Sequence, residues 1–312
     1  MNEIFIHIGL HKTATGTLQR QFFPACKNLN ILTTLIPEVK AFVEEVTRRD
    51  PLYFDKVKAN KIITSVIDTQ KVNLLSNESL SGPPYAGAIE AGLDHRLPVL
   101  NNLSNVFPNA KVILVLRRQD ALAKSFYRQY LKSGGTRSVH RFYGMDTNKG
   151  PALMSLDRFY FLKYVQAVIS SFPAGVLILP FEEFVQSQTM FLKKLTEFIG
   201  VPMPNLELKS ENATRLGPLG LEISRILNHL FRNLLNPAGI IPGFKPKRAE
   251  ANYRNYRVSP LEIVHDKWFM HKKCAKGEID RIASKIFYMV EDDNKNIDKI
   301  FNLNLRYYGY YK

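Results

Sequence analysis

The chain has 312 residues, of which 45% are hydrophobic and 23% are charged, a composition that excludes global disorder and is sufficient for a substantial core. Its 43 Lys and Arg residues outnumber its 28 Asp and Glu residues, which gives a formal net charge of +15. A basic excess of this size indicates an anionic partner: nucleic acid, a membrane surface, or acidic small molecules and glycans. Charge alone does not choose among these partners.

The cysteine count and the N-terminal residues bear on the compartment. Cys26 and Cys274 are too few for a disulfide framework and lack metal-ligand spacing, so buried thiols are expected, with one long-range bridge as the alternative. The apolar run in residues 3–8 is short, alternates, and leads into a polar motif, unlike a signal peptide. No run of about 18 apolar residues occurs that would span a membrane. These features predict a cytoplasmic protein without a membrane span.

Strand and helix patterns alternate along the first two thirds of the chain. The predicted strands are 3–8, 71–76, 111–116 and 176–180, of which 111–116 (KVILVL) is a continuous apolar run typical of a parallel sheet. The predicted helices are 17–23, most of 38–70, 119–133, 156–171, 181–199, 218–235 and 276–291. Such alternation predicts an α/β fold of three layers, in which helices flank a mostly parallel central sheet. We expect one domain over 1–312, with a core of about 1–205 and a C-terminal helical extension of about 206–312.

The most informative segment, Gly9 to Thr17 (GLHKTATGT), joins the first predicted strand to the first helix. Small residues allow a tight turn that presents backbone N–H groups, the helix N-terminus adds partial positive charge, and Lys12 adds a full charge. These features predict a phosphate-binding loop; the alternative is an ordinary strand-to-helix turn capped by threonine. The segment is not a nucleotide-kinase loop, because GxxxxGK[ST] places the lysine after the second glycine.

A second candidate anion site follows the strand 111–116. Arg117 stands at the carboxyl end of that strand, where α/β folds bind ligands, and Ser125 lies eight residues further on in the predicted basic helix. A guanidinium group binds a terminal phosphate through two hydrogen bonds, and a hydroxyl adds a third. Taken alone, the pattern is more typical of a strand-end arginine followed by a solvated helix.

Together the two motifs resemble those of sulfotransferases that use 3′-phosphoadenosine 5′-phosphosulfate (PAPS), in particular the bacterial and carbohydrate-type enzymes. The loop of that family reads approximately GxxKTGTT, and an Arg and a Ser eight residues apart follow a later strand. The resemblance covers about residues 3–200. It implies a P-loop NTPase-like sulfotransferase fold, PAPS as sulfuryl donor, 3′,5′-diphosphoadenosine (PAP) as product, and no metal.

The resemblance also implies roles for individual residues. Lys12 would contact the bridging and 5′-phosphate oxygens, Arg117 and Ser125 would hold the 3′-phosphate, and Phe181 would lie near the adenine. Phe181 begins a Phe-Glu-Glu sequence where the family has one close to YED. The implied cofactor-binding residues are Gly9, Lys12, Thr13, Ala14, Thr15 (with its hydroxyl), Gly16, Thr17, Arg117, Ser125 and Phe181. Two of them depart from the family pattern: Ala14 replaces a glycine, and Gly16 stands where a second Thr or Ser supplies a hydroxyl.

Glu78 is the predicted general base for in-line transfer, with Lys12 as the electrostatic group. Glu78 directly follows the strand 71–76 and should lie on the same sheet edge as the loop. Family members look similar here, with a strand, a Ser/Glu turn, and a glutamate as base. The alternative for Glu78 is a surface or helix-capping role.

Histidines are the rival candidates for the base, because imidazole is the commonest general base in enzymes. The rivals are His11, His95 and His140. His11 adjoins the phosphate-binding loop and is predicted to contact the cofactor or the acceptor. His7 lies inside the first strand and is predicted to be a buried histidine without a catalytic role.

Residues 236–257 interleave basic and aromatic side chains, and Lys245, Tyr253 and Arg254 among them are predicted, with His11, to contact the acceptor. The pattern suits an acidic or sugar-like acceptor; single-stranded nucleic acid and a solvated loop are the alternatives. The predicted function is sulfuryl transfer from PAPS to a hydroxyl or amine of a carbohydrate or small metabolite. The alternatives are a P-loop kinase-like phosphotransferase and a non-enzymatic basic nucleic-acid-binding protein.

Overall fold

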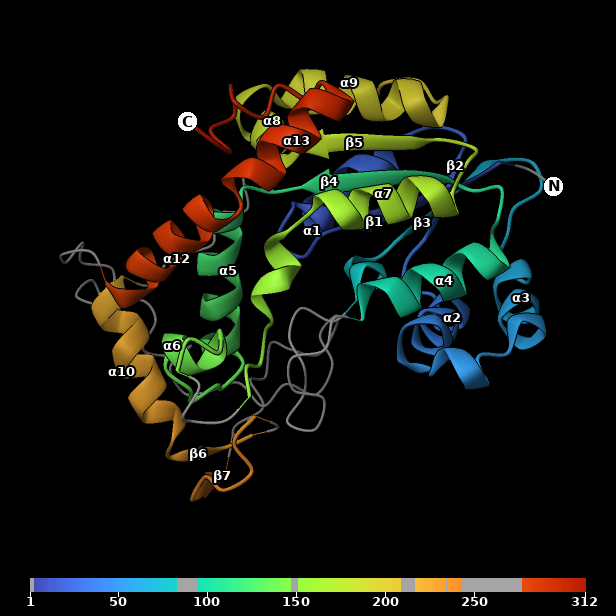
Figure 1. The fold of residues 1–312 in the computed structure, drawn as a ribbon. Coiled ribbons are helices and arrows are strands. Elements are labelled where there is room, and N and C mark those ends of the chain that lie inside the picture. The colour runs from blue at the N-terminus through green and yellow to red at the C-terminus, as the bar shows by residue number, and fades with distance from the viewer. Residues whose placement is uncertain (1–2, 83–94, 147–150, 209–216, 234, 243–276) are drawn as a thin grey trace.

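The computed structural model describes residues 3–82, 95–146, 151–208, 217–233, 235–242 and 277–312 (Figure 1). A five-stranded sheet in the order β2-β3-β1-β4-β5 forms its centre, and every neighbouring pair of strands is parallel. The strands are Ile4–Gly9 (β1), Leu29–Leu32 (β2), Val72–Ser76 (β3), Lys111–Leu116 (β4) and Val176–Pro180 (β5). The predicted α/β class with a parallel central sheet flanked by helices is therefore confirmed.

The strand order places a topological switch point between β1 and β4. From β1 the chain builds β2 and β3 on one side of the sheet, and then crosses to build β4 and β5 on the other side. Gly9, the last residue of β1, is in register with Val115 of β4, so the two strands end at the same edge. In open parallel sheets, the loops that leave two such strands diverge and open a ligand-binding crevice. The two predicted anion-binding motifs follow β1 and β4.

Helices cover both faces of the sheet, because alternate residues of each strand point to opposite faces. Ile4, Ile6 and Ile8 of β1 belong to one buried apolar cluster, whereas Phe5 belongs to another. The helices are Thr15–Thr17 (α1), Pro37–Arg48 (α2), Lys56–Thr64 (α3), Arg96–Val106 (α4), Gln119–Lys132 (α5), Val139–Phe142 (α6), Leu162–Ser171 (α7), Phe181–Gln186 (α8), Gln188–Ile199 (α9), Pro218–Asn228 (α10), Glu278–Met289 (α12) and Glu291–Phe301 (α13). Figure 1 shows α8 and α9 on one side of the sheet and α7 on the other.

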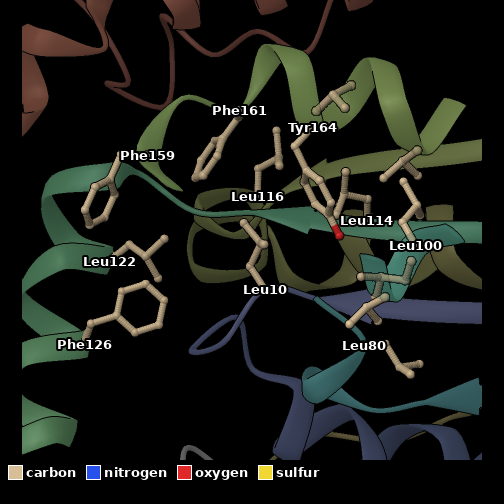
Figure 2. Packing of buried hydrophobic residues seen from close by; sticks show 14 of the residues in the cluster. Leu10, Leu80, Leu100, Leu114, Leu116, Leu122, Phe126, Phe159, Phe161 and Tyr164 are labelled. Atoms are coloured by element: carbon tan, nitrogen blue, oxygen red, sulfur yellow. The ribbon is translucent and has the colours of Figure 1, made fainter. Parts of the chain in front are cut away.

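The apolar packing fixes the loop after β1 against α5. Leu10, which follows β1, and Leu116, at the end of β4, belong to the same buried cluster as Leu122 and Phe126 of α5. Figure 2 shows these side chains at the carboxyl edge of the sheet, with Phe159 beside them. Since each is nearly inaccessible to solvent, the start of the loop and the inner face of α5 are held together by burial of apolar surface.

Several predicted boundaries are wrong in detail. The predicted helix 181–199 is two helices, because the backbone at Ser187 (φ −143°, ψ 62°) is not helical. The predicted helix 156–171 begins as a separate 3₁₀ turn, Leu156–Phe159, before α7. The predicted helix 17–23 is a helical turn, α1, continued by π-helical and 3₁₀ turns over Leu18–Phe22 and Phe23–Ala25.

The C-terminal region also differs from the prediction. The helix predicted over 218–235 ends at Asn228, where the side-chain amide of Asn236 donates hydrogen bonds to the carbonyls of Asn228 (2.9 Å) and His229 (3.1 Å). These bonds satisfy carbonyls that a helix end leaves without partners. The chain then forms a small parallel pair of strands, Phe231–Arg232 (β6) and Ile241–Pro242 (β7). A further helix, α13, follows α12 and was not predicted.

Candidate functional site

The loop after β1 has the backbone geometry of an anion cradle. Lys12 (φ 71°) and Ala14 (φ 60°) both adopt the left-handed conformation, which turns the chain sharply before α1 begins at Thr15. The Thr13 hydroxyl donates to the carbonyl of Leu10 at 2.5 Å and so closes the turn from within. Backbone N–H groups at such a turn and at the following helix start attract an anion. Ala14 therefore adopts a left-handed conformation that favours glycine.

Gly9 is required because Thr15 packs directly against it. A Cβ atom at Gly9 would lie 2.3 Å from Thr15 Oγ1 and 3.2 Å from His7 Nε2. The Thr15 hydroxyl is buried and has no hydrogen-bond partner among the described residues, as is also true of His7 Nε2. A buried hydroxyl without a partner costs free energy, and an oxygen atom of a bound anion would relieve that cost.

Arg117 joins the two predicted anion sites. It directly follows β4, and its Nη1 donates a hydrogen bond to the carbonyl of Lys12. Its guanidinium lies over the ring of Phe181, the first residue of α8, at 4.8 Å from the ring centroid. A cation over an aromatic face is attracted by the ring, which fixes the plane of the guanidinium. The strand-end arginine, the loop lysine and Phe181 thus meet at the switch point.

Lys12 lies in a field of positive charge. Its ammonium group donates to Gln129 Oε1 of α5 at 2.7 Å. Partial burial and the positive charges of Lys132 and Arg117 lower the pKa of Lys12, whereas the Glu78 carboxylate opposes that shift. When neighbouring cations lower one another's pKa, a bound anion stabilises their charged forms.

The predicted Ser125 lies on α5 one helical turn before Gln129, the residue that contacts Lys12. It precedes Gln129 by four residues, and residues four apart occupy one face of a helix. Since Gln129 contacts Lys12, Ser125 belongs to the helix face that borders the loop. Sequence reasoning missed Gln129, although its spacing from Ser125 was a usable signal.

Glu78 stands at the end of β3, the strand beside β1, in the short turn Glu78–Ser81. Asn77 caps this turn by accepting a hydrogen bond from the Ser79 N–H at 2.8 Å. The Glu78 side chain is half-buried and lies near enough to Lys12 to oppose the lowering of that lysine's pKa. The predicted base therefore shares the sheet edge with the loop after β1, which was predicted to bind phosphate.

The histidines differ in environment. His11 Nε2 is bonded to the carbonyl of Gly82 (3.1 Å), and burial together with the charges of Arg158 and Lys12 lowers its pKa to about 3. Burial lowers the pKa of His7 to about 4, and His7 Nδ1 lies 2.8 Å from Ser76 Oγ. Both rings are therefore neutral at neutral pH.

His95 and His140 occupy other elements. His95 precedes α4, whereas His140 lies in α6 with Nε2 3.6 Å from a Glu278 carboxylate oxygen. Lys245, Tyr253 and Arg254, the predicted acceptor contacts, lie outside the described residues, as does Cys274. Cys26 is buried, which raises the pKa of its thiol to about 11.

The described residues contain neither a metal-binding cluster nor a membrane-spanning helix. Within the described residues, no three His, Cys, Asp or Glu side chains gather closely enough to hold a metal ion. In that same part of the chain, the helices are too short or too polar to cross a bilayer.

Comparison with known proteins gives matches among solved structures. No family model matches the chain, and no curated protein matches it. The chain is similar to a sulfotransferase from Alicyclobacillus acidocaldarius, with 17% identity and a TM-score of 0.46. The alignment covers 68% of this chain and 87% of that one. It is also similar to a sulfotransferase domain from the olefin synthase of Synechococcus PCC 7002, with 13% identity and a TM-score of 0.34. That alignment covers 92% of this chain and 94% of the other.

Proposed function

We propose that the protein is a sulfotransferase that moves the sulfuryl group of PAPS to a hydroxyl or amine of an acceptor, a carbohydrate or small metabolite. The observation that carries this proposal is the contact between Arg117 and the Lys12 carbonyl. It unites a loop suited to a 5′-phosphosulfate with an arginine suited to a 3′-phosphate. A donor with charged groups at both positions matches two such sites better than a nucleoside triphosphate does.

The residues present fit such a donor. The unpartnered, buried Thr15 hydroxyl and the left-handed turn at Lys12 and Ala14 suit the 5′ end. Arg117 and Ser125 would hold the 3′-phosphate, while Phe181 offers a ring face beside them. The loop backbone from Thr13 to Thr17 would surround the 5′-phosphate.

PAPS, when bound, supplies an activated sulfuryl group whose sulfur–oxygen bond to the phosphate breaks as the acceptor oxygen or nitrogen attacks. Lys12 would stabilise the negative charge that develops on the leaving phosphate, an electrostatic role that a fixed cation performs well. Glu78 would take the proton that the acceptor loses. Both side chains come from loops at one sheet edge, so the structure can orient base and cation toward one reacting centre.

The proposal is tested by calorimetric titration with PAP and, separately, with ATP and Mg²⁺. We expect tight binding of PAP that is strongly weakened in Lys12→Ala and in Arg117→Ala. Lys111→Ala is the matched control, because it removes one positive charge from the opposite end of β4, where Lys111 pairs with Glu3 at 2.7 Å. Preference for ATP with Mg²⁺ would favour a phosphotransferase, and steeply salt-dependent nucleic-acid binding unaffected by Lys12→Ala would favour the third alternative.

The base is tested by Glu78→Gln, which preserves shape and removes the proton acceptor. We expect turnover to fall by roughly a hundredfold or more, while PAP affinity stays within a few fold. Glu38→Gln, an exposed carboxylate of α2, should change neither quantity. Turnover retained in Glu78→Gln would assign the base to another residue.

A further inference from the structure

The last residues of the chain return to the sheet beside the Arg117 site. Tyr310, two residues before the C-terminal Lys312, is fully buried. Its hydroxyl donates a hydrogen bond to Glu182 Oε2 at 2.7 Å. The other oxygen of the same carboxylate, Oε1, accepts from the backbone N–H of Arg118 at 3.1 Å. Figure 1 shows α13 and the C-terminus close to α8, which carries Glu182.

A second link ties the same corner to α13. The fully buried side chains of Gln119 and Asn294 exchange two hydrogen bonds, of 2.7 and 3.1 Å. The amide of Asn294 also donates to the carbonyl of Tyr310 at 3.0 Å. The two residues that follow Arg117 are thus both held by contacts that lead to Tyr310. Buried polar networks of this kind fix one arrangement, because any partial break leaves a polar group without a partner.

We propose that Tyr310 is a positioning residue for the Arg117 anion site, an inference that rests on the proposed function. Glu182 is adjacent to Phe181, whose ring face lies under the Arg117 guanidinium. With both oxygens engaged, Glu182 fixes the start of α8 against the corner between β4 and α5. The Phe181 ring and the Arg117 guanidinium are then held in the arrangement in which we expect Arg117 to bind a phosphate. The hydroxyl keeps its proton, because burial and the nearby Glu182 carboxylate raise the pKa of Tyr310 well above its ordinary value.

The chain offers a matched pair of variants. Tyr310→Phe removes one tyrosine hydroxyl that donates to a carboxylate at 2.7 Å. Tyr311→Phe removes another of the same length, to Asp298 Oδ2 within the C-terminal region. Both substitutions keep the aromatic ring. They differ in burial, because Tyr310 is fully buried and Tyr311 half-buried, and only the Tyr310 hydroxyl leads to the Arg117 corner.

The experiment is titration of the full chain and of both variants with PAP and with adenosine 5′-phosphate, which lacks the 3′-phosphate. We expect Tyr310→Phe to weaken PAP binding about tenfold, the usual effect of losing a hydrogen bond to a charged group. Adenosine 5′-phosphate should lose clearly less affinity than PAP, because it lacks the 3′-phosphate and is affected only by a shift of the Phe181 ring beside the adenine. Tyr311→Phe should leave both affinities unchanged. A general loss of structure would weaken both ligands, so the selective loss is the signature of positioning.

A second variant reads the same link from its other end. Glu182→Gln should weaken PAP selectively, and it should add little in the Tyr310→Phe background, because the two residues act as one unit. Equal loss of both ligands, or PAP affinity unchanged in Tyr310→Phe, would overturn the positioning role while leaving the donor assignment standing. A wild-type chain that binds no PAP would overturn both.

Discussion

Gly9→Ala offers the most direct test of how the loop after β1 is packed. The added methyl group would lie 2.3 Å from Thr15 Oγ1, roughly 1 Å inside the 3.4 Å at which ordinary van der Waals contact begins. Thr15 is buried at the first turn of α1, so it cannot simply swing into solvent. Either its χ1 rotates or the loop shifts. Overpacking of this kind costs about 1–3 kcal/mol, and we expect Gly9→Ala to reduce the free energy of unfolding by about 2 kcal/mol.

Thr15→Ala serves as the partner in a double-mutant cycle. It removes the clashing oxygen, whose hydrogen bonding the described residues do not satisfy, so its own cost should be about 1 kcal/mol or less. With Oγ1 gone, the nearest atoms to an alanine at position 9 are His7 Nε2 and Thr13 Oγ1, both at 3.2 Å. The double variant should therefore be more stable than the sum of the single effects by about 1–2 kcal/mol.

The assay is equilibrium urea unfolding of wild type, both single variants and the double variant, compared at constant slope m. A shift in midpoint without a change in m reports stability alone. Additive effects, within about 0.5 kcal/mol, would refute the reasoning, because they would mean that the Thr15 hydroxyl does not occupy the space above Gly9.

Two further predictions concern buried charge. Lys194→Met should destabilise the protein by about 2 kcal/mol in urea unfolding, because it leaves the buried Glu183 carboxylate, 2.5 Å from the Lys194 ammonium, without its cation. The control is the neighbouring Lys193→Met, which breaks an exposed ion pair and should cost little. Acid should destabilise the fold through His7, whose pKa of about 4 in the folded chain lies below the ordinary 6.5. The contribution of the neutral ring to the free energy of unfolding, about 3 kcal/mol, is complete above pH 6.5 and is lost as the pH falls toward 4. Urea midpoints measured from pH 7 to 4.5 should fall less steeply in His7→Gln than in wild type or in the surface control His140→Gln; equal slopes would contradict the assignment.

The parts of the fold that the sequence predicts are those in which local pattern and burial agree. KVILVL is buried from Val112 to Leu116 and forms β4 over the predicted residues, because an apolar run without polar alternation is stable only between two layers. β2, over Leu29–Leu32, was missed: it is a short edge strand, and three of its four side chains are only half-buried. Without full burial, the sequence has no reason to carry a continuous apolar run.

The motifs of the candidate site were predicted one by one from the sequence, but the contact between them was not. Gly9 to Thr17 and Arg117 are each recognisable from spacing, whereas their contact depends on β1 and β4 being neighbours, a property of the strand order. The pairing of Glu182 with Tyr310 spans 128 residues and leaves no local trace, because a tyrosine near a chain end is ordinary in composition. Long-range polar pairings of this kind are decided by topology rather than by propensity.

The charge excess acquires a physical meaning at the switch point. Elsewhere basic side chains lie beside carboxylates, as Lys124 does with Asp280 and Arg225 with Glu222. At the loop, partial burial and the nearby charges of Lys132 and Arg117 together lower the pKa of Lys12, so its charged form is disfavoured there. A bound polyanion would reverse that shift. Ligand at a hundred times the wild-type Kd would then raise the free energy of unfolding by about 2.7 kcal/mol. At the same ligand concentration, Lys12→Ala should be stabilised less, because its Kd is higher.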